Sequence, residues 1–417
     1  MNNSLLYRLD WISLLIYLLL VGFGLLNIYS STFQEFGLAF SDLSANSGKQ
    51  FWIFIGCLFF MPFVLYLKSN FFEHFSYLFY ALSIVGLIGL FIFGQKIAGA
   101  TSWYSIGGFG LQPSEFAKIT TALVLSEFLS GIQKDISKRN DFLKVLFFIL
   151  LPVFLILLQP DAGSALVFFA LFFVLFREGL HLKWLFLALG ILAVFLATLL
   201  FKPLIVCAGC VFILFTALLL GRKRRRKINP RLYIIMGVSC IAFSYSVDFI
   251  FNSVFEQRHR DRFNIILGLE TDTRGIGYNI NQSKIAIGSG GFSGKGFLNG
   301  TQTKGGFVPE QHTDYIFSTI GEEWGFLGSS CVVLLFTLFI FRIIYRAEKQ
   351  TSAFRRIYSY AFASILYFHF FINIGMTLGL VPTIGIPLPF ISYGGSSLMA
   401  FSLMFFIYLN LDSNRLT

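Results

Sequence analysis

Long apolar stretches, separated by short polar ones, run along most of the chain. About 20 consecutive apolar residues cross a bilayer as a helix, and by this rule the pattern predicts twelve spans. Their ranges are residues 11–29, 51–67, 73–94, 115–130, 143–159, 163–178, 183–201, 203–220, 231–251, 314–341, 358–380 and 391–411. The fourth range is short and residues 183–220 also fit one kinked element, so ten or eleven spans remain open. The first stretch has no small-residue cleavage site after it and is expected to stay as a span.

The composition agrees with a membrane protein. Hydrophobic residues make up 56% of the 417 positions and charged residues only 13%, and Phe alone occupies 54 positions. Soluble domains carry about 25% charged residues, so the composition excludes a soluble enzyme, a disordered protein and a fibrous protein. We therefore predict an all-α polytopic integral membrane protein with 10–12 transmembrane helices, twelve being favoured.

The positions of the basic residues predict the orientation. The chain has a formal net charge of +11, and most of its Lys and Arg lie in segments that are cytoplasmic if the N-terminus is cytoplasmic, including the run 222–227. Cytoplasmic loops are enriched in Lys and Arg, so we predict cytoplasmic N- and C-termini and no nucleic-acid partner. The distinctive polar segments (95–115, 159–163, a large loop at about 252–312 and the Pro-rich turn 381–389) then face outward, which predicts extracytoplasmic chemistry.

The outer loop 252–312 is rich in glycine, which serves tight turns and close backbone approach. It has neither a phosphate-binding loop nor a dinucleotide fingerprint: Gly296 follows Lys295 where Ser or Thr would be needed, and Ser293 replaces the last glycine of the fingerprint. A compact re-entrant or surface loop is the structural alternative.

Asp272 lies beside glycines in this loop, with Arg258 and Arg262 nearby in the sequence. A carboxylate at a cleft that opens at the membrane surface can act as a general base, and guanidinium groups stabilise anionic leaving groups. The alternative is a solvated loop aspartate.

The segment 112–118 is expected to begin a helix that Ser114 caps. Glu115 and Lys118 are three residues apart, so they share one face of that helix and can pair. Ionisable groups at the edge of the hydrocarbon are costly, which favours a polar site, although a structural ion pair is the alternative.

Residues 309–314 lead into the tenth span, which also carries Glu322 and Glu323. On a helix, Asp314 and Glu322 are about 80° apart, so we expect both to face one polar cleft. His312 lies nearby, but no ligand spacing supports a metal site there. Prolines and paired glycines at 381–397 break a helix at membrane depth, and such a backbone persists only beside protein or a cavity. This segment is therefore predicted to form a wall of the same cavity.

Three of these segments resemble the SEDS family of cell-wall polymerases, the RodA/FtsW group, and the similarity extends over nearly the whole chain. They are Gln-Pro-Ser-Glu-Phe-Ala-Lys (112–118), Pro-Glu-Gln-His-Thr-Asp-Tyr-Ile-Phe (309–317) and Pro-Phe-Ile-Ser-Tyr-Gly-Gly-Ser-Ser (389–397). The segment 294–303 resembles the elongation branch, RodA, more than the division branch. Two features depart from the family: Ser102 precedes Trp103 where the family has Arg, so that Lys96 is a candidate for its role, and the extra apolar sequence predicts an additional helical hairpin within 183–251.

The resemblance implies a peptidoglycan glycosyltransferase that polymerises lipid II into glycan strands during cell elongation, with undecaprenyl pyrophosphate as the leaving group. It implies a bacterial inner-membrane protein, one SEDS-type membrane domain over 1–417, and membrane lipid, a class B penicillin-binding protein transpeptidase and elongation-complex proteins as partners. Asp272, in the loop 252–312, matches the family's catalytic aspartate. The predicted substrate-binding residues are Glu115, Lys118, Arg258, Arg262, Gln282, Ser283, His312, Asp314 and Ser396. We assign no metal ligand and leave a need for Mg²⁺ or another divalent cation open.

Two other functions remain as alternatives. A lipid II flippase or other polytopic lipid transporter would also contain intramembrane acids and broken helices. A transporter, however, should place coupling groups near mid-membrane and on the inner side as well, whereas the polar motifs here gather on the outer side. A structural scaffold for wall-synthesis complexes is the third class.

Overall fold

The computed structural model describes residues 8–36, 41–97, 99–106, 109–223, 230–254, 257, 260, 264 and 276–414. The chain divides into two compact units. The first unit comprises Met1–Leu180 and Tyr278–Thr417, and the second comprises His181–Gly277.

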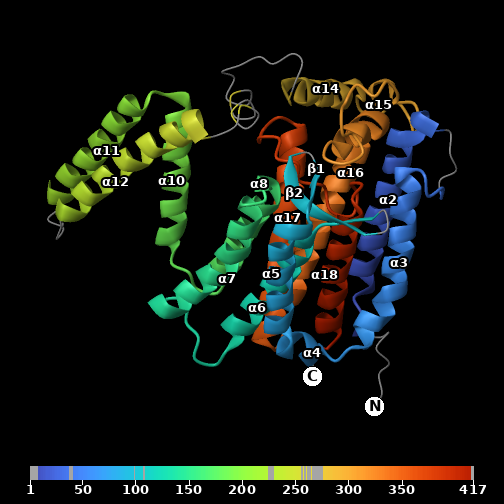
Figure 1. The fold of residues 1–417 in the computed structure, drawn as a ribbon, viewed down its shortest axis with the longest axis horizontal. Coiled ribbons are helices and arrows are strands. Elements are labelled where there is room, and N and C mark those ends of the chain that lie inside the picture. The colour runs from blue at the N-terminus through green and yellow to red at the C-terminus, as the bar shows by residue number, and fades with distance from the viewer. Residues whose placement is uncertain are drawn as a thin grey trace. The chain divides into compact units, whose positions relative to one another are not determined.

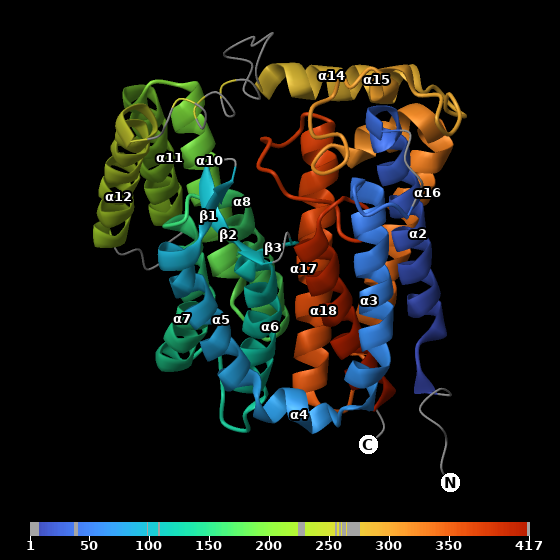
Figure 2. The ribbon, with the colours of Figure 1, turned by 45° about the vertical axis from the view of Figure 1, so that its right-hand side comes forward.

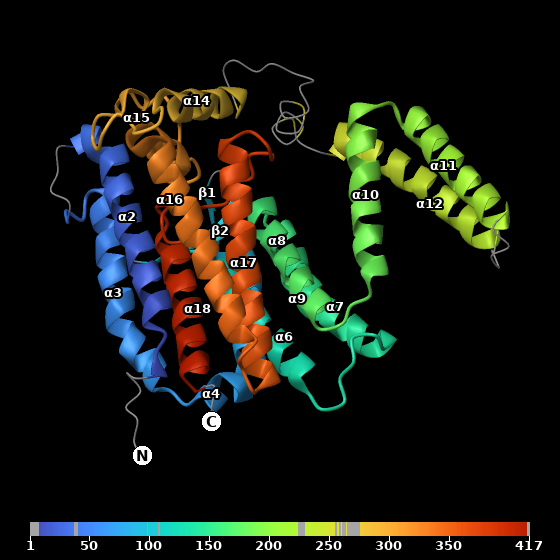
Figure 3. The same cartoon turned by 180° about the vertical axis from the view of Figure 1, so that it is seen from behind.

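The first unit is a bundle of long helices. Its helices in the described residues are α2 (Trp11–Phe36), α3 (Asn46–Tyr66), α4 (Ser69–His74), α5 (Ser76–Phe93), α6 (Pro113–Ser130), α7 (Arg139–Leu157), α8 (Ala162–Val167), the 3₁₀ helix η1 (Phe168–Ala170), α9 (Leu171–Arg177), α14 (Ile276–Ser289), α15 (Thr301–Lys304), α16 (Ile316–Ala347), α17 (Ala353–Thr377) and α18 (Gly395–Ser413). Figures 1, 2 and 3 show α14 and α15 across one end of the bundle, opposite the end where α2 begins and α18 finishes.

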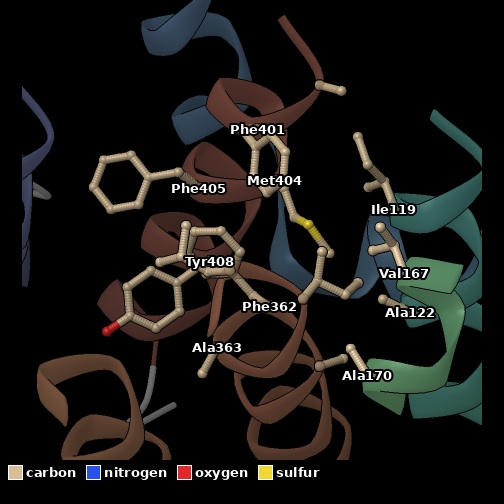
Figure 4. Close-up of a cluster of buried hydrophobic side chains, with 14 of the residues drawn as sticks. Ile119, Ala122, Val167, Ala170, Phe362, Ala363, Phe401, Met404, Phe405 and Tyr408 are labelled. Atoms are coloured by element: carbon tan, nitrogen blue, oxygen red, sulfur yellow. The ribbon is translucent and has the colours of Figure 1, made fainter. Parts of the chain in front are cut away.

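Helices α17 and α18 lie at the centre of the bundle. Helix α17 packs against α6, α9, α16 and α18, and most residues of both central helices are buried. In the part of the core drawn in Figure 4, the Met404 side chain of α18 lies between the aromatic rings of α17 and α18 and a facing set from α6 and the α8–η1 segment that includes the small residues Ala122 and Ala170. Small residues let helices approach closely. In a bilayer, where lipid tails are as apolar as the side chains, helices associate through such close van der Waals packing.

A small antiparallel sheet precedes α6. Strands β1 (Gln95–Ile97), β2 (Ala100–Ile106) and β3 (Phe109–Leu111) pair in the order β1-β2-β3. Tyr104 on β2 donates a hydrogen bond to Gly86 O at 2.8 Å, which attaches the sheet to α5. The sheet is an addition to the predicted all-α fold, and it delivers the chain directly to the start of α6.

The predicted fold class is confirmed, but the preferred number of spans is not. Every predicted span is occupied by helix, and ten helices in the described residues are long and apolar enough to cross a membrane. Helix α6 is outside this set and carries three ionisable residues (Glu115, Lys118 and Glu127), and the α8–α9 segment is short and interrupted by η1.

The second unit contains α10 (Leu182–Leu200), α11 (Pro203–Lys223), α12 (Pro230–Phe249) and the π-helical turn η2 (Ile250–Val254). Helices α11 and α12 pack against each other, and a hydrogen bond of 3.0 Å between Thr198 Oγ1 and Ser244 Oγ links α10 to α12. The additional hairpin that we expect within 183–251 falls on these helices and stays a prediction, as does the assignment of 1–417 to one domain.

An ionic cluster joins three helices at the end of the bundle where α2 begins. Asp10 forms an ion pair of 2.8 Å with Arg342, and Arg346 lies 3.3 Å from Asp10 and also binds Asp412. Burial alone would raise the pKa of Asp10, but hydrogen bonds from Arg342 and Ser13 and the charge of Arg346 outweigh burial, so the pKa of Asp10 is lowered. The cluster fixes the start of α2 and the ends of α16 and α18 relative to one another.

Candidate active site

A buried ion pair lies near the start of α6. Lys118 Nζ donates a hydrogen bond to Glu115 Oε1 at 2.8 Å, and both side chains are almost fully buried. The predicted pair is confirmed, and its cause is the three-residue spacing along one helix face. Glu115 Oε2 is buried and has no hydrogen-bond partner among the described residues, so one acceptor of the pair remains unused.

His369 of α17 is a second partner of Lys118. Its Nε2 lies 3.0 Å from Lys118 Nζ, and its Nδ1 lies 3.1 Å from Pro387 O. The Phe401 ring of α18 is 5.1 Å from Lys118 Nζ and packs edge-on against the imidazole at 4.8 Å. Our sequence reasoning missed His369, although a single histidine in an apolar span is a recognisable signal.

The residue before α6 connects three motifs that are far apart in the sequence. The Gln112 backbone N–H donates to Ser396 Oγ at 3.0 Å, and the same hydroxyl donates to Gly110 O at 2.7 Å. Gln112 Nε2 donates to Asp161 Oδ2 at 3.0 Å. Ser396 is therefore buried beside the ion-pair helix, with its hydroxyl bonded to backbone on both sides.

The predicted cap of α6 is wrong. Ser114 is inside the helix rather than before it, because Pro113 occupies the first helical position. The Ser114 hydroxyl is buried and has no partner among the described residues. Glu115, in contrast, lies in the first turn as expected, where a carboxylate suits the helix dipole.

The segment with His312 and Asp314 lies against the Pro-rich turn. Tyr393 N donates to His312 O at 2.8 Å. Asn373 of α17 donates to both Asp314 O and Ile386 O, at 2.9 and 2.8 Å. The structure thus joins these two predicted site residues to the segment that we expect to form a cavity wall, and Asn373 is a contact that the sequence did not reveal.

Asp314 and Glu322 do not share a helix face. Helix α16 begins at Ile316, and Asp314 precedes it in a turn where Thr313 N and Tyr315 N both donate to Glu310 O. The expected separation of about 80° assumed one continuous helix, so that prediction is wrong.

Glu322 instead anchors the segment 295–303. Its carboxylate is fully buried and accepts hydrogen bonds of 2.8 Å from Lys295 Nζ, from the backbone N–H of Gln302 and Thr303, and from the Thr303 hydroxyl. Thr301 Oγ1 donates a further bond of 3.2 Å. This set satisfies the first N–H groups of the short helix α15 and binds it to α16.

The glycine-rich loop pairs with a bend in α16. Gly325 has φ 62° and ψ −157°, a conformation essentially restricted to glycine. In a straight helix the N–H groups of residues 326 and 327 would bond to the carbonyls of 322 and 323. The loop supplies partners to all four groups. Its N–H groups at Lys295 and Gly296 donate to Glu322 O (3.0 Å) and Glu323 O (2.9 Å). Its carbonyls at Gly291 and Phe292 accept from Phe326 N (2.9 Å) and Leu327 N (3.1 Å).

The glycines allow this close approach. A Cβ atom at Gly290 would lie 2.0 Å from Gly321 O, and one at Gly294 would lie 2.2 Å from Glu323 O. Both contacts are with backbone and leave no room for a side chain. The structural interpretation of the glycine-rich segment, a compact loop, therefore applies to residues 290–296.

Helix α14 rests on the end of α17. The buried hydroxyl of Ser283 donates to Thr377 O at 2.9 Å, a carbonyl in the last turn of α17 that has no partner within its own helix. Gln282, the neighbouring residue of the predicted site, is half-buried. The loop, α15 and α14 thus cover the same end of the bundle.

An apolar cavity of about 630 Å³ lies between α3, β3, α6 and α18. Its lining includes Phe60, Leu111, Phe116 and Phe406. Gly110 belongs to the lining as well as to the hydrogen-bonded junction before α6. An apolar cavity therefore adjoins the segment that leads into the Glu115–Lys118 helix.

The family model described as "cell cycle protein", covering FtsW, RodA and SpoVE, matches residues 10–208 and 181–416. The chain belongs to this family. Among the relatives of this FtsW/RodA/SpoVE protein is the peptidoglycan glycosyltransferase RodA of Treponema pallidum, 32% identical over 98% of both chains. The peptidoglycan glycosyltransferase MrdB of Escherichia coli is 31% identical, over 98% of this chain and 94% of the other.

Solved structures agree with the fold of this FtsW/RodA/SpoVE protein. A chain from a study titled "Structural coordination of polymerization and crosslinking by a peptidoglycan synthase complex" is 26% identical and has a TM-score of 0.71, covering 98% of this chain and 99% of the other. The rod shape determining protein RodA of Thermus thermophilus is 24% identical with a TM-score of 0.63, over 98% of both chains.

Three predicted site residues lie outside the described residues, namely Asp272, Arg258 and Arg262. Glu115, Lys118 and Ser396 lie close together around the start of α6, whereas His312 and Asp314 adjoin the Pro-rich turn and Gln282 and Ser283 lie on α14. Pro387 of that turn contacts His369, which contacts Lys118. The residues around the start of α6 are therefore linked to those beside the Pro-rich turn. Across the described ranges, no group of three His, Cys, Asp or Glu residues could hold a metal ion.

Proposed function

We propose that the chain is a peptidoglycan glycosyltransferase of the elongation type, which polymerises lipid II into glycan strands. The observation that carries the proposal is the match, over 98% of this chain, to relatives named peptidoglycan glycosyltransferase. The buried Glu115–Lys118 pair and the apolar cavity lined by Leu111 and Phe116 support it, because a lipid-linked substrate needs both a polar site and space for its tail.

The reaction in this proposal is a direct, inverting displacement. The GlcNAc 4-hydroxyl of an incoming lipid II attacks the anomeric carbon of the growing chain, Asp272 takes the hydroxyl proton, and the bond to undecaprenyl pyrophosphate breaks. A general base raises the nucleophilicity of the hydroxyl, and fixed positive charge stabilises the departing pyrophosphate.

Lys118 supplies part of that positive charge, and Arg258 and Arg262 supply the rest. Glu115 orients Lys118 through the bond of 2.8 Å. The burial of the pair strengthens its effect on a bound anion, because electrostatic interactions grow as the local dielectric falls. The cavity between α3, β3, α6 and α18 receives apolar tail segments.

The orientation follows from the charges. The end of the bundle with α14, α15 and the glycine-rich loop is extracytoplasmic, and the Asp10–Arg342–Arg346–Asp412 cluster at the other end is cytoplasmic. Because basic residues favour the cytoplasmic side, the proposal has both termini on that side of the bacterial inner membrane. A class B penicillin-binding protein is the partner, a proposal supported by the likeness to a chain from a peptidoglycan synthase complex.

The test uses the purified full chain in proteoliposomes with its partner, labelled lipid II and moenomycin, which suppresses contaminating polymerases of the other type. We expect labelled glycan polymer from the wild type and none from the D272A variant. Parallel vesicles with fluorescent lipid II in one leaflet measure translocation. Translocation without polymer would favour the transporter class and contradict the proposal. Repeating the reaction with a chelator determines whether a divalent cation is required.

A further inference from the structure

We propose that His369 is a positioning residue, whose neutral imidazole holds the Lys118 ammonium in the orientation that acts on the departing pyrophosphate. The inference rests on the proposed function and adds to it a residue that lies 251 positions from Lys118 in the sequence.

The two contacts of the imidazole determine its tautomer. Nδ1 lies 3.1 Å from Pro387 O, and a carbonyl oxygen only accepts, so Nδ1 carries the hydrogen. Nε2 lies 3.0 Å from Lys118 Nζ, and an ammonium only donates, so Nε2 provides a lone pair. His369 is therefore neutral, and it accepts from Lys118 while donating to the Pro-rich turn.

This arrangement divides the three N–H groups of the ammonium. One binds Glu115 Oε1 and one binds His369 Nε2. The third has no hydrogen-bond partner among the residues that the structure describes, and in the proposed function it binds the pyrophosphate. Without the imidazole, Glu115 Oε2 is an available acceptor, because it is buried with no partner in the described part of the chain. Lys118 would then turn toward the carboxylate with two N–H groups and away from the substrate.

The packing around His369 limits its movement. The Phe401 ring lies edge-on at 4.8 Å, and the imidazole is almost fully buried. A side chain held on one side by a ring and on the other by a backbone carbonyl has little rotational freedom, which is what a positioning contact requires. Through Pro387, the position of Lys118 also depends on the Pro-rich turn.

The experiment compares variants of the full chain in proteoliposomes with lipid II. In H369L both hydrogen bonds are lost. We expect kcat to fall about tenfold while KM changes less than about twofold, because His369 acts on the substrate only through Lys118. H369Q keeps an amide oxygen within reach of Lys118 and should retain most of the activity. The matched control is Y358F on the same helix, which loses a bond of 3.1 Å to Met404 O without contacting Lys118 and should leave the rate unchanged.

A double-mutant cycle separates positioning from a general structural role. In the K118M background, H369L should cause no further loss, because His369 acts through Lys118. An equal tenfold loss in both backgrounds, or an H369Q rate as low as that of H369L, would overturn the inference. If H369L does not fold, H369N replaces it, since its shorter amide can reach Pro387 O but not Lys118. A wild type without polymerase activity refutes the proposed function, whereas an active wild type with H369L equal to Y358F refutes only this inference.

Discussion

Replacing Gly294 by alanine should detach the glycine-rich loop from the bend in α16, whereas replacing Gly291 should not. Both residues have positive φ, 80° and 58°, so an alanine at either position carries a similar backbone strain of about 1 kcal/mol. They differ in the space around a Cβ atom. At Gly294 the new atom would lie 2.2 Å from Glu323 O, and at Gly291 nothing lies within 4 Å.

The difference between the two variants can be worked from the hydrogen bonds of the bend. The clash at Gly294 is with backbone, so it can be relieved only by separating the loop from α16. Separation breaks the four backbone bonds between residues 291–296 and residues 322–327. At about 1 kcal/mol for each bond, G294A should weaken local closure by about 4 kcal/mol more than G291A.

Hydrogen exchange measures this local opening directly. The amides of Phe326 and Leu327 are protected by the loop, and about 4 kcal/mol corresponds to an exchange rate about a thousandfold higher in G294A than in G291A. Equal protection of these two amides in both variants would refute the account of the loop as the partner of the bend. Amides in the middle of α17 serve as an internal reference and should not change.

Two further predictions concern residues that join separate segments. In S396A the Gln112 N–H loses its acceptor and Gly110 O loses its donor, so thermal unfolding should show a loss of about 2 kcal/mol. The control S397A should be near neutral, because the Ser397 hydroxyl forms no hydrogen bond with the residues that the structure describes; equal losses in the two variants would contradict this. In D10N the cluster with Arg342 and Arg346 is weakened by about 2 kcal/mol at neutral pH. Because the pKa of Asp10 is lowered in the folded state, the extra stability of the wild type over D10N should be complete above about pH 4 and should disappear as the pH falls through the folded pKa. If the wild type stayed more stable than D10N in acid, the ion pairs would not be its cause.

The sequence predicted the spans well because hydrocarbon imposes one requirement on every crossing segment, a long apolar helix. Glu115 and Lys118 were paired correctly for a similar reason, since their contact lies within one turn of one helix. The three-stranded sheet was not expected, because strands of three to seven residues show too little alternation to be recognised.

Contacts between distant segments were beyond prediction from a single sequence. Glu322 looked like a cleft-facing acid, yet its partners are loop residues 19–27 positions away. His369 meets Lys118 across 251 positions, and no periodicity reports such a contact. The start of α16 was placed too early because residues 310–315 form turns that satisfy their own backbone.

The most direct test of the proposed mechanism is the turnover of lipid II by the D272N variant in proteoliposomes. Asparagine keeps the size of the side chain but cannot take a proton from the sugar hydroxyl. We predict that kcat falls at least about a hundredfold with KM nearly unchanged, as expected for loss of a general base. Polymer formation by D272N at the wild-type rate would contradict the assignment of Asp272 as the base.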